Sequence, residues 1–275
     1  MKSALRFLVG ARARSSEPVL RSERLLHVLI FIAGLALWEA TSRLGWLPKI
    51  VLPSPSSIML RLYDLFASGL IWPHLWATTV SILSGFGLGV AIGFAFGAAV
   101  ALLPAIERLV YPYMVAFQTV PKVAIAPLFI LWFGYGLMSK VVIAATVCLF
   151  PVLVSVMSAF HVTDRDQLDM MRACGASSWQ TFVHLRIRAA LPIIFNGLEI
   201  AAVFAVIGAV VGEFVGAQAG LGYLITTLNF NLDVPGVFAV LILLSLLGIM
   251  LHDVVRRIGR RLVFWIRSER TELMT

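Results

Sequence analysis

The chain has 275 residues, of which 60% are hydrophobic and only 13% are charged. Soluble domains carry about 45–50% apolar and about 25% charged residues, so this composition excludes an ordinary soluble protein and predicts an integral membrane protein. The net charge of +8 would suit nucleic acid in a soluble protein. Here the basic residues lie between apolar stretches, where their counterpart is the anionic inner leaflet of the lipid bilayer, and nucleic acid is not expected as a partner.

Six apolar stretches are long enough to cross a membrane, which takes about 20 residues for a core about 30 Å thick. Prolines at three positions interrupt the third stretch, so we expect that span to be kinked or broken. The sequence therefore predicts an all-α integral membrane fold with about six transmembrane helices. The expected spans are Leu25–Leu44, Ala77–Leu103, Val110–Gly134, Val141–Phe160, Ala190–Gly212 and Val237–Val255.

The distribution of basic residues predicts the orientation of the spans. With both termini in the cytoplasm, 17 of the 22 lysines and arginines fall on the inner side and four on the outer side. This asymmetry satisfies the positive-inside rule. We therefore expect a cytoplasmic N-terminal segment (1–24), a transmembrane domain (25–258) and a cytoplasmic C-terminal tail (259–275). The first span lacks a cleavage pattern and is expected to be a retained anchor.

Glycines recur every four residues in the second span and again in the fifth. Residues four apart share one face of a helix, and small residues on that face let another backbone approach closely. We expect these two ladders to be helix-packing surfaces. Their members are Gly85, Gly89, Gly93 and Gly97 in the second span, and Gly208 and Gly212 in the fifth.

The long polar loop at 161–186 is predicted to contain two short helices. Residues 164–173 have a helix-forming composition, and Gly175 suits a helix stop in the left-handed conformation. Ser177 with Gln180 three residues later forms a capping box that starts the next helix through Trp179. We call these two short helices and the glycine between them the elbow. The composition alone leaves open whether the elbow binds a partner or is an ordinary solvated loop.

Five segments of the sequence resemble a known family of transporters. Asp169-Met170-Met171-Arg172-Ala173-Cys174-Gly175, followed by Ala190-Leu191-Pro192, resembles the EAA motif of binding-protein-dependent ABC importer permeases. Residues 52–55, 119–134 and 206–224 resemble the nitrate/sulfonate/taurine branch of that family. The resemblance covers about residues 25–265. The sequence departs from the motif where Asp169-Met170-Met171 replaces Glu-Ala-Ala and where Arg188 replaces a usual proline.

The resemblance implies a type I ABC importer permease-like bundle in the bacterial cell inner membrane. The polar loop would be the coupling helix, which docks on a separate cytoplasmic ABC ATPase dimer. A second permease copy, forming a homodimer, and an external solute-binding protein are the other implied partners. The chain itself would be no enzyme and hold no cofactor, because ATP and Mg would bind the partner ATPase. The implied ATPase-coupling residues are Leu168, Asp169, Met171, Arg172, Gly175, Ala176, Ser177 and Trp179.

Polar residues inside predicted spans or at their ends are candidates for the translocation pathway, because a charge at the centre of a bilayer costs about 2.5–3.5 kcal/mol or more. These candidates are Gln118, Lys122, Asn196, Glu199 and Glu213. A cationic Lys122 would suit an anionic solute. The alternative is that Lys122 pairs with an acid or extends to a membrane surface.

The sequence leaves the cargo open and makes two other classes of function less favoured. The branch suggests a nitrate-, sulfonate- or taurine-like solute, and a pyrimidine vitamin precursor or a flavin is the alternative. An ion-coupled secondary transporter is less favoured, because no inverted repeat is evident. A membrane enzyme is less favoured as well, because the sequence shows no clustered catalytic groups, and scattered Cys and His residues predict no metal site.

Overall fold

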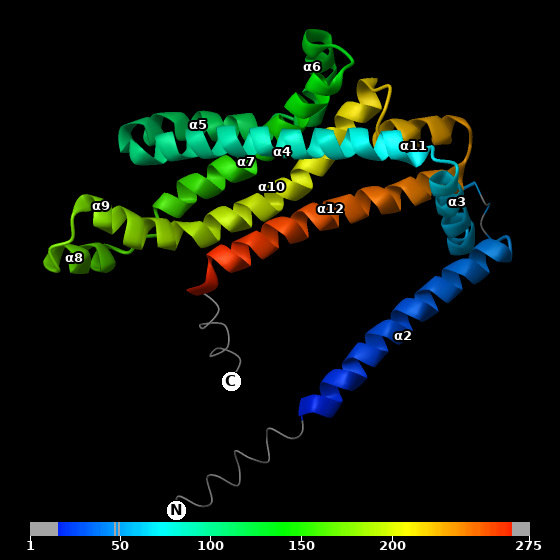
Figure 1. The fold of residues 1–275 in the computed structure, drawn as a ribbon, viewed down its shortest axis with the longest axis horizontal. Helices are drawn as coiled ribbons and strands as arrows, with labels where there is room; N and C mark the ends of the chain where they lie inside the picture. The colour runs from blue at the N-terminus through cyan, green and yellow to red at the C-terminus, as the bar shows by residue number, and fades with distance from the viewer. Residues whose placement is uncertain (1–15, 47, 49, 266–275) are drawn as a thin grey trace, which may run out of the picture.

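The computed structural model describes residues 16–46, 48 and 50–265, and every regular element in these ranges is helical. Figure 1 shows an elongated bundle from which one helix, α2, diverges. The helices are α2 (Ser16–Arg43), α3 (Pro55–Ala67), α4 (Ile71–Leu102), α5 (Pro104–Thr119), the 3₁₀-helix η1 (Lys122–Ile125), α6 (Ala126–Phe133), α7 (Leu137–Phe160), α8 (Arg165–Ala173), α9 (Ser178–Thr181), the π-helical turn η2 (Phe182–Arg186), α10 (Ile187–Gly216), α11 (Leu221–Phe230) and α12 (Val234–Leu262).

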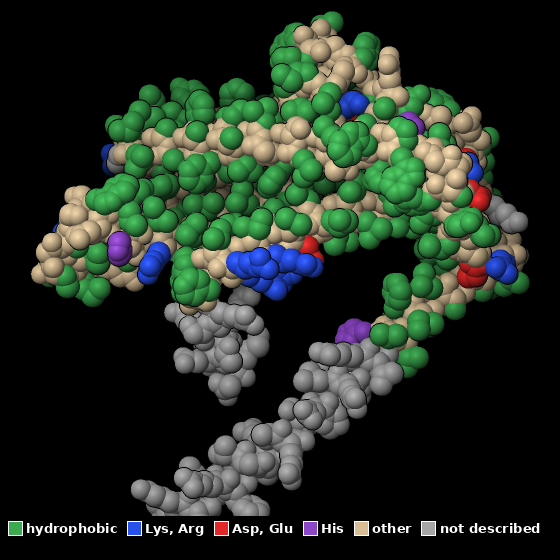
Figure 2. All heavy atoms as spheres, viewed as in Figure 1, with side chains coloured by type: hydrophobic (Ala, Val, Ile, Leu, Met, Phe, Trp, Pro, Cys, Tyr) green, Lys and Arg blue, Asp and Glu red, His purple; other side chains and the backbone are tan. Residues whose placement is uncertain are grey.

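The prediction of about six membrane helices is confirmed. Five helical stretches among the described residues are long and apolar enough to cross a membrane, and they lie in α2, α4, α7, α9–α10 and α12. A sixth span is broken into α5 and η1–α6, which meet at 78°. Figure 2 shows hydrophobic side chains over most of the side of the bundle, with the largest group of lysines and arginines over the C-terminal part of α12. A lipid-embedded protein has this distribution of side chains.

Several boundaries differ from those expected. The second span starts at Ile71 and not at Ala77, because Pro73 is tolerated in the first turn of a helix. The fifth span continues without a break from Ser178 to Gly216 through the π-helical turn. Within the expected N-terminal segment, helix α2 already begins at Ser16. Residues 1–15 and 266–275 of the two expected terminal segments lie outside the described residues.

Helix α7 lies at the centre of the bundle between α4 and α10. The first glycine ladder faces α7: a Cβ added at Gly93 would meet the Leu149 carbonyl oxygen at 2.8 Å, and one at Gly97 would meet Val156 Cβ at 2.9 Å. Gly208 of the second ladder lies equally close to α7, where an added Cβ would meet Ala144 Cα at 2.7 Å. Both ladders therefore allow backbone-to-backbone packing against one central helix.

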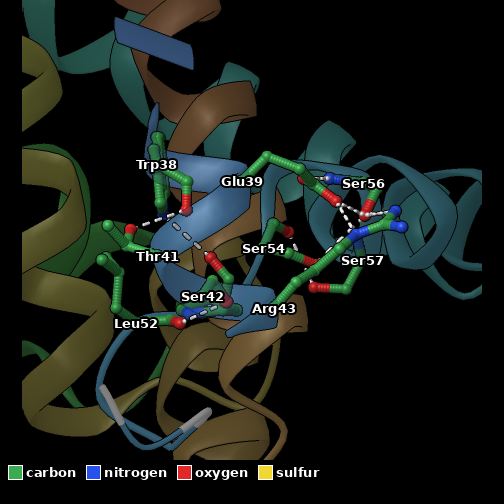
Figure 3. Close-up of polar contacts among 10 residues, drawn as sticks. Trp38, Glu39, Thr41, Ser42, Arg43, Leu52, Ser54, Ser56 and Ser57 are labelled. Carbon is green, nitrogen blue, oxygen red and sulfur yellow. Dashed lines mark hydrogen bonds and ion pairs between the residues drawn. The ribbon is translucent and has the colours of Figure 1, made fainter. Parts of the chain in front are cut away.

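Helix α2 is attached to the rest of the chain near its C-terminal end. Only 6% of its membrane-spanning window is buried. Figure 3 shows Glu39 reaching from α2 to the start of α3, where its carboxylate accepts hydrogen bonds from the backbone N–H and the hydroxyl of Ser56 at 3.0 and 2.6 Å. Ser42 donates to the Leu52 carbonyl oxygen in the connecting segment. These contacts join α2 and α3 at the end of the bundle opposite α8 and α9 (Figure 1).

Candidate functional site

The polar elbow of α8 and α9 projects from one end of the bundle (Figure 1). Asp164 caps the start of α8, where its side chain accepts from the N–H of Asp166 at 3.3 Å. The helix ends in a Schellman motif: Ala176 N–H donates to the Met171 carbonyl oxygen, and Gly175 N–H donates to that of Arg172. Gly175 has φ of +72°, the left-handed conformation that glycine adopts without strain.

A capping box fixes the start of α9, directly after the Schellman motif. The Ser177 hydroxyl accepts from the Gln180 N–H at 3.2 Å, and the Gln180 side chain accepts from the Ser177 N–H at 2.8 Å. Both sides of the glycine are therefore held by local hydrogen bonds, which makes the elbow a short rigid element. The predicted coupling residues divide into exposed Asp169, Arg172, Gly175, Ser177 and Trp179, and half-buried Leu168, Met171 and Ala176.

A row of aromatic rings connects this elbow with the end of α7. Trp179, whose side chain is 72% exposed, stacks on Phe182 with ring centroids 5.9 Å apart. Phe182 stacks in turn on Phe160, the last residue of α7, at 6.4 Å. Trp179 was predicted as a coupling residue, but this row was not predicted. The spacing of Trp179 and Phe182, three residues apart on a helix, was the one signal for it.

A second connection runs from the base of the elbow to α5. His161 follows the last residue of α7, and its Nε2 lies 3.2 Å from a carboxylate oxygen of Glu107 in the first turn of α5. The other ring nitrogen, Nδ1, lies 2.9 Å from the Met157 carbonyl oxygen. Neither member of this pair was predicted as a site residue, because nothing in the sequence indicates that these distant residues meet.

Gln118 and Lys122, two candidates for the pathway, lie together where the third span breaks. Lys122 Nζ donates to the Gln118 carbonyl oxygen at 3.3 Å and sits 4.5 Å from the centroid of the Phe150 ring. The break follows from Pro121, which lacks an N–H group and keeps Val120 in an extended conformation.

Asn196 and Glu199 lie about one turn apart on α10, away from the break. Asn196 is exposed, while Glu199 is half-buried and lies 3.5 Å from Nε2 of His252 on α12. The structure therefore gives Glu199 a histidine partner within the bundle. It does not bring Glu199 together with Lys122.

Glu213, a predicted pathway residue, is buried where α4, α10 and α11 meet. Its side chain is 1% exposed and accepts hydrogen bonds from the Thr78 hydroxyl at 2.8 Å and the Gly222 N–H at 2.7 Å. The Thr78 hydroxyl also accepts from the Leu221 N–H at 2.7 Å. Glu213 is a structural anchor in this arrangement, because it and Thr78 satisfy two free N–H groups at the start of α11.

Two further side chains hold the segment between α10 and α11. Lys140 Nζ donates to the Ala219 carbonyl oxygen at 2.7 Å, and Gly220 N–H donates to Nδ1 of His74 at 3.1 Å. Gly220 has φ of +136° and packs directly on the Glu213 carboxyl group, where a side chain would collide. Side chains from α4, α7 and α10 thus fix one short segment.

A hollow of about 510 Å³ lies at the same end of the bundle as α3. It is lined mainly by serines of the α2–α3 connection and by residues at the start of α12, among them Ser42, Arg43, Ser54, Ser56, Val234 and Pro235. Neither this hollow nor the elbow contains a set of metal ligands: the described residues include no group of three or more His, Cys, Asp or Glu side chains close enough to hold an ion.

Comparisons with known proteins agree with this architecture. Residues 87–264 match the family model described as "Binding-protein-dependent transport system inner membrane component". The chain is 37% identical to the formylaminopyrimidine transport permease protein ThiX of Halalkalibacterium halodurans, over 88% of this chain and 96% of that protein. It is 37% identical to the riboflavin transport system permease protein RibX of Chloroflexus aurantiacus, over 85% and 87%.

More distant similarities extend to sulfonate permeases and to a solved structure. The chain is 33% identical to the aliphatic sulfonates transport permease protein SsuC of Escherichia coli, over 84% of this chain and 87% of that protein. An inward-facing structure of the MetNI methionine ABC transporter contains a chain of similar fold. The TM-score is 0.60 at 21% sequence identity, and the match covers 70% of this chain and 97% of that one.

Proposed function

Because the chain belongs to the family of binding-protein-dependent transport system inner membrane components, we propose that its α8–α9 elbow docks on a separate ATPase and drives import of a small solute. The chain is thus the permease subunit of an ABC importer. The observation that carries the docking proposal is the elbow itself: it projects from the bundle, both of its helices are capped, and no residue of α8 is buried.

The elbow has the composition that a docking element needs. Asp169 and Arg172 form an exposed ion pair at 3.0 Å, and exposed pairs of this kind contribute little to stability. Trp179 is exposed although tryptophan usually gains from burial, and it is among the residues that most often anchor interfaces. A partner that covers these groups would gain both an aromatic anchor and charge complementarity.

Three connections would carry a displacement of the elbow into the bundle. The Trp179–Phe182–Phe160 row leads to α7, the His161–Glu107 pair leads to α5, and α9 continues through η2 into α10. A π-helical turn is a frequent feature at functional positions. Movement of packed helices as rigid bodies is a common mechanism of switching, and it would here open the bundle to alternate sides.

The remaining parts of the machinery follow from the same premise. We propose that two copies of this chain pair in the membrane, that ATP and Mg bind the ATPase dimer, and that an external solute-binding protein delivers the cargo at the end formed by α3 and α11. Both termini would face the cytoplasm of a bacterial cell, in keeping with the charge asymmetry. This family comprises transporters and not enzymes, and its dependence on a binding protein argues against an ion-coupled carrier.

The cargo is proposed as a small solute that the binding protein selects. The named relatives transport a formylaminopyrimidine, riboflavin and aliphatic sulfonates. A sulfonate- or taurine-like solute and a pyrimidine vitamin precursor or flavin are therefore the two candidates. Ligand binding by the solute-binding protein encoded beside this chain decides between them, because its pocket sets the specificity.

Cross-linking from the elbow tests the docking proposal. A photoreactive amino acid at position 179 is expected to capture a nucleotide-hydrolysing chain in intact cells. The matched control places the same probe at Phe230, which is 82% exposed near the opposite end of the bundle and should capture no such chain. If position 179 captures no ATPase, the elbow does not couple the permease to ATP.

Charge reversal gives a second test of the same contact. The double change Asp169→Arg with Arg172→Asp should abolish uptake while membrane insertion is unchanged. The control is the equivalent reversal of Asp253 and Arg257, an exposed pair four residues apart near the end of α12. Normal uptake in the elbow variant, or equal loss in both variants, would contradict the assigned role.

A further inference from the structure

The break in the third span places a lysine close to the middle of the bundle. Phe150 lies near the centre of α7, a 24-residue helix that crosses the whole bundle. Lys122 Nζ sits 4.5 Å from the centroid of the Phe150 ring. Because α7 extends about equally far on both sides of this ring, the ammonium group lies at mid-depth, distant from either membrane surface.

The ammonium group has no anionic partner in the part of the chain that the structure describes. No carboxylate there lies within ion-pair distance of Lys122 Nζ, and its contacts are the Gln118 carbonyl oxygen and the Phe150 ring. A cation over an aromatic face gains about 0.5–2 kcal/mol. That gain is smaller than the cost of a charge at the bilayer centre, about 2.5 kcal/mol or more.

Lys140, in the same bundle, is a lysine whose charge is compensated by neighbouring groups. Lys140 is 5% exposed, lies near the start of α7, donates to Ala219 and is attracted by the Glu213 carboxyl group. Lys122 is only half-buried, and its neighbours Gln118 and Thr119 are exposed. Its charge is therefore available to a group that arrives from outside the fold.

From this geometry we propose that Lys122 forms a mid-membrane binding site for an anionic group. The ligand class is a solute with a carboxylate, sulfonate or phosphate, held by the ammonium group next to the exposed residue Gln118. The inference rests on the proposed function, because a transported solute must pass the middle of the bundle. It favours an anionic cargo, such as the sulfonates named for one relative, over an uncharged one such as the riboflavin named for another.

Thiol reactivity beside the lysine tests the site without knowledge of the cargo. Gln118→Cys provides a reporter, and it preserves the backbone carbonyl that Lys122 contacts. Cys174→Ser removes the exposed native thiol, whereas Cys148 is buried and stays. The probes are two methanethiosulfonates of similar size, one bearing a sulfonate and one a quaternary ammonium group. Their reaction rates are measured by mass spectrometry on the full permease in nanodiscs of phosphatidylcholine.

The sulfonate reagent should react faster than the cationic reagent when Lys122 is present. Lys122→Gln should lower this rate ratio about tenfold, since a unit charge nearby shifts the two reagents in opposite directions. Lys122→Arg should keep the ratio high. A reporter at the exposed turn position Asn231 should show the same ratio in all variants, which verifies that each variant is folded and each reagent is active.

Three outcomes would overturn the proposal. The first is a rate ratio that Lys122→Gln leaves unchanged, and the second is a failure of both reagents to react at position 118. The third is a rate ratio that falls only when anionic phosphatidylglycerol is added. The last outcome would identify Lys122 as a lipid-phosphate contact. These readouts need no ATPase, so their failure is distinguishable from failure of the elbow to bind its motor subunit.

Discussion

His161 and Glu107 meet 3.2 Å apart, and they join the end of α7 to the first turn of α5. His161 lies three residues before Asp164, the cap of α8. The same histidine therefore contacts α5 on one side and leads into the elbow on the other. Since α5 ends at the break that holds Lys122, this pair connects the two functional regions proposed for the chain.

Glu107→Ala should uncouple the elbow from α5 with little effect on folding. The pair is partly exposed, so its loss should cost only about 0–1 kcal/mol of stability. The expected result is that addition of ATP no longer changes the reactivity of the Gln118→Cys reporter in the complex with the ATPase. The measurement compares thiol labelling rates with and without nucleotide.

Glu107→Asp is the matched variant for that experiment, because it keeps the charge with a shorter side chain. Partial recovery of the nucleotide effect is expected. A full nucleotide effect in Glu107→Ala would show that α5 receives its displacement by another route.

Glu213→Ala should destabilise the bundle strongly. The change removes the acceptor of the Gly222 N–H and of the Thr78 hydroxyl, and each buried donor left without a partner costs about 1–3 kcal/mol. A clear fall in the thermal unfolding temperature of the purified chain in detergent is expected. Glu199→Ala, at a half-buried residue, should lower that temperature less. Equal effects of the two changes would contradict the anchoring role of Glu213.

Gly89→Ala should weaken the packing of α4 on α7. The added Cβ would meet the Ala145 carbonyl oxygen at 2.7 Å, and such overpacking typically costs about 1–3 kcal/mol. Gly87→Ala is the control two positions away, where nothing lies within 4 Å of the added atom. That change should be neutral or slightly stabilising, because alanine favours the helix by up to about 1 kcal/mol. Thermal unfolding of both variants measures the difference.

The effect of each substitution at Gly175 should follow the strain that the new residue has in the left-handed conformation. Asparagine adopts φ near +72° more readily than alanine, and proline cannot adopt it. Affinity for the ATPase should therefore fall in the order Gly, Asn, Ala, Pro, with about 1–2 kcal/mol of strain for alanine. No neighbouring atom lies within 4 Å of an added Cβ, so a clash would not explain the order. Equal affinities for glycine and proline would contradict the rigid elbow.

Local signals in the sequence predicted much of the fold and of the elbow. Hydropathy identified the spans, the prolines of the third stretch indicated a break, and the Ser177–Gln180 pair identified the start of α9, because each signal depends on residues close together in the chain. The contacts of Glu213 with Gly220 and Gly222 were not predicted, because the folding of that segment back onto Glu213 is a tertiary event. The sequence alone does not distinguish a buried structural acid from an acid that lines a pathway.

Contacts between distant residues account for what else was missed. The His161–Glu107 pair depends on how α5 lies beside α7, and no spacing rule reports that arrangement. The ring row of Trp179, Phe182 and Phe160 depends likewise on how the end of α7 lies beside Phe182, the first residue of the π-helical turn. Sequence patterns identified the elements, whereas their contacts required the three-dimensional arrangement.

Helix α2 is attached to the rest of the chain near its C-terminal end, so it forms a unit separate from the bundle. Its connections to the remainder are concentrated around Trp38, Glu39 and Ser42, next to the turn that leads into α3. The packing of α4, α7 and α10 therefore depends very little on α2. A shortened chain that begins just before α3 would retain an intact central bundle, and the leading helix would be an independent attachment to lipid or to neighbouring chains.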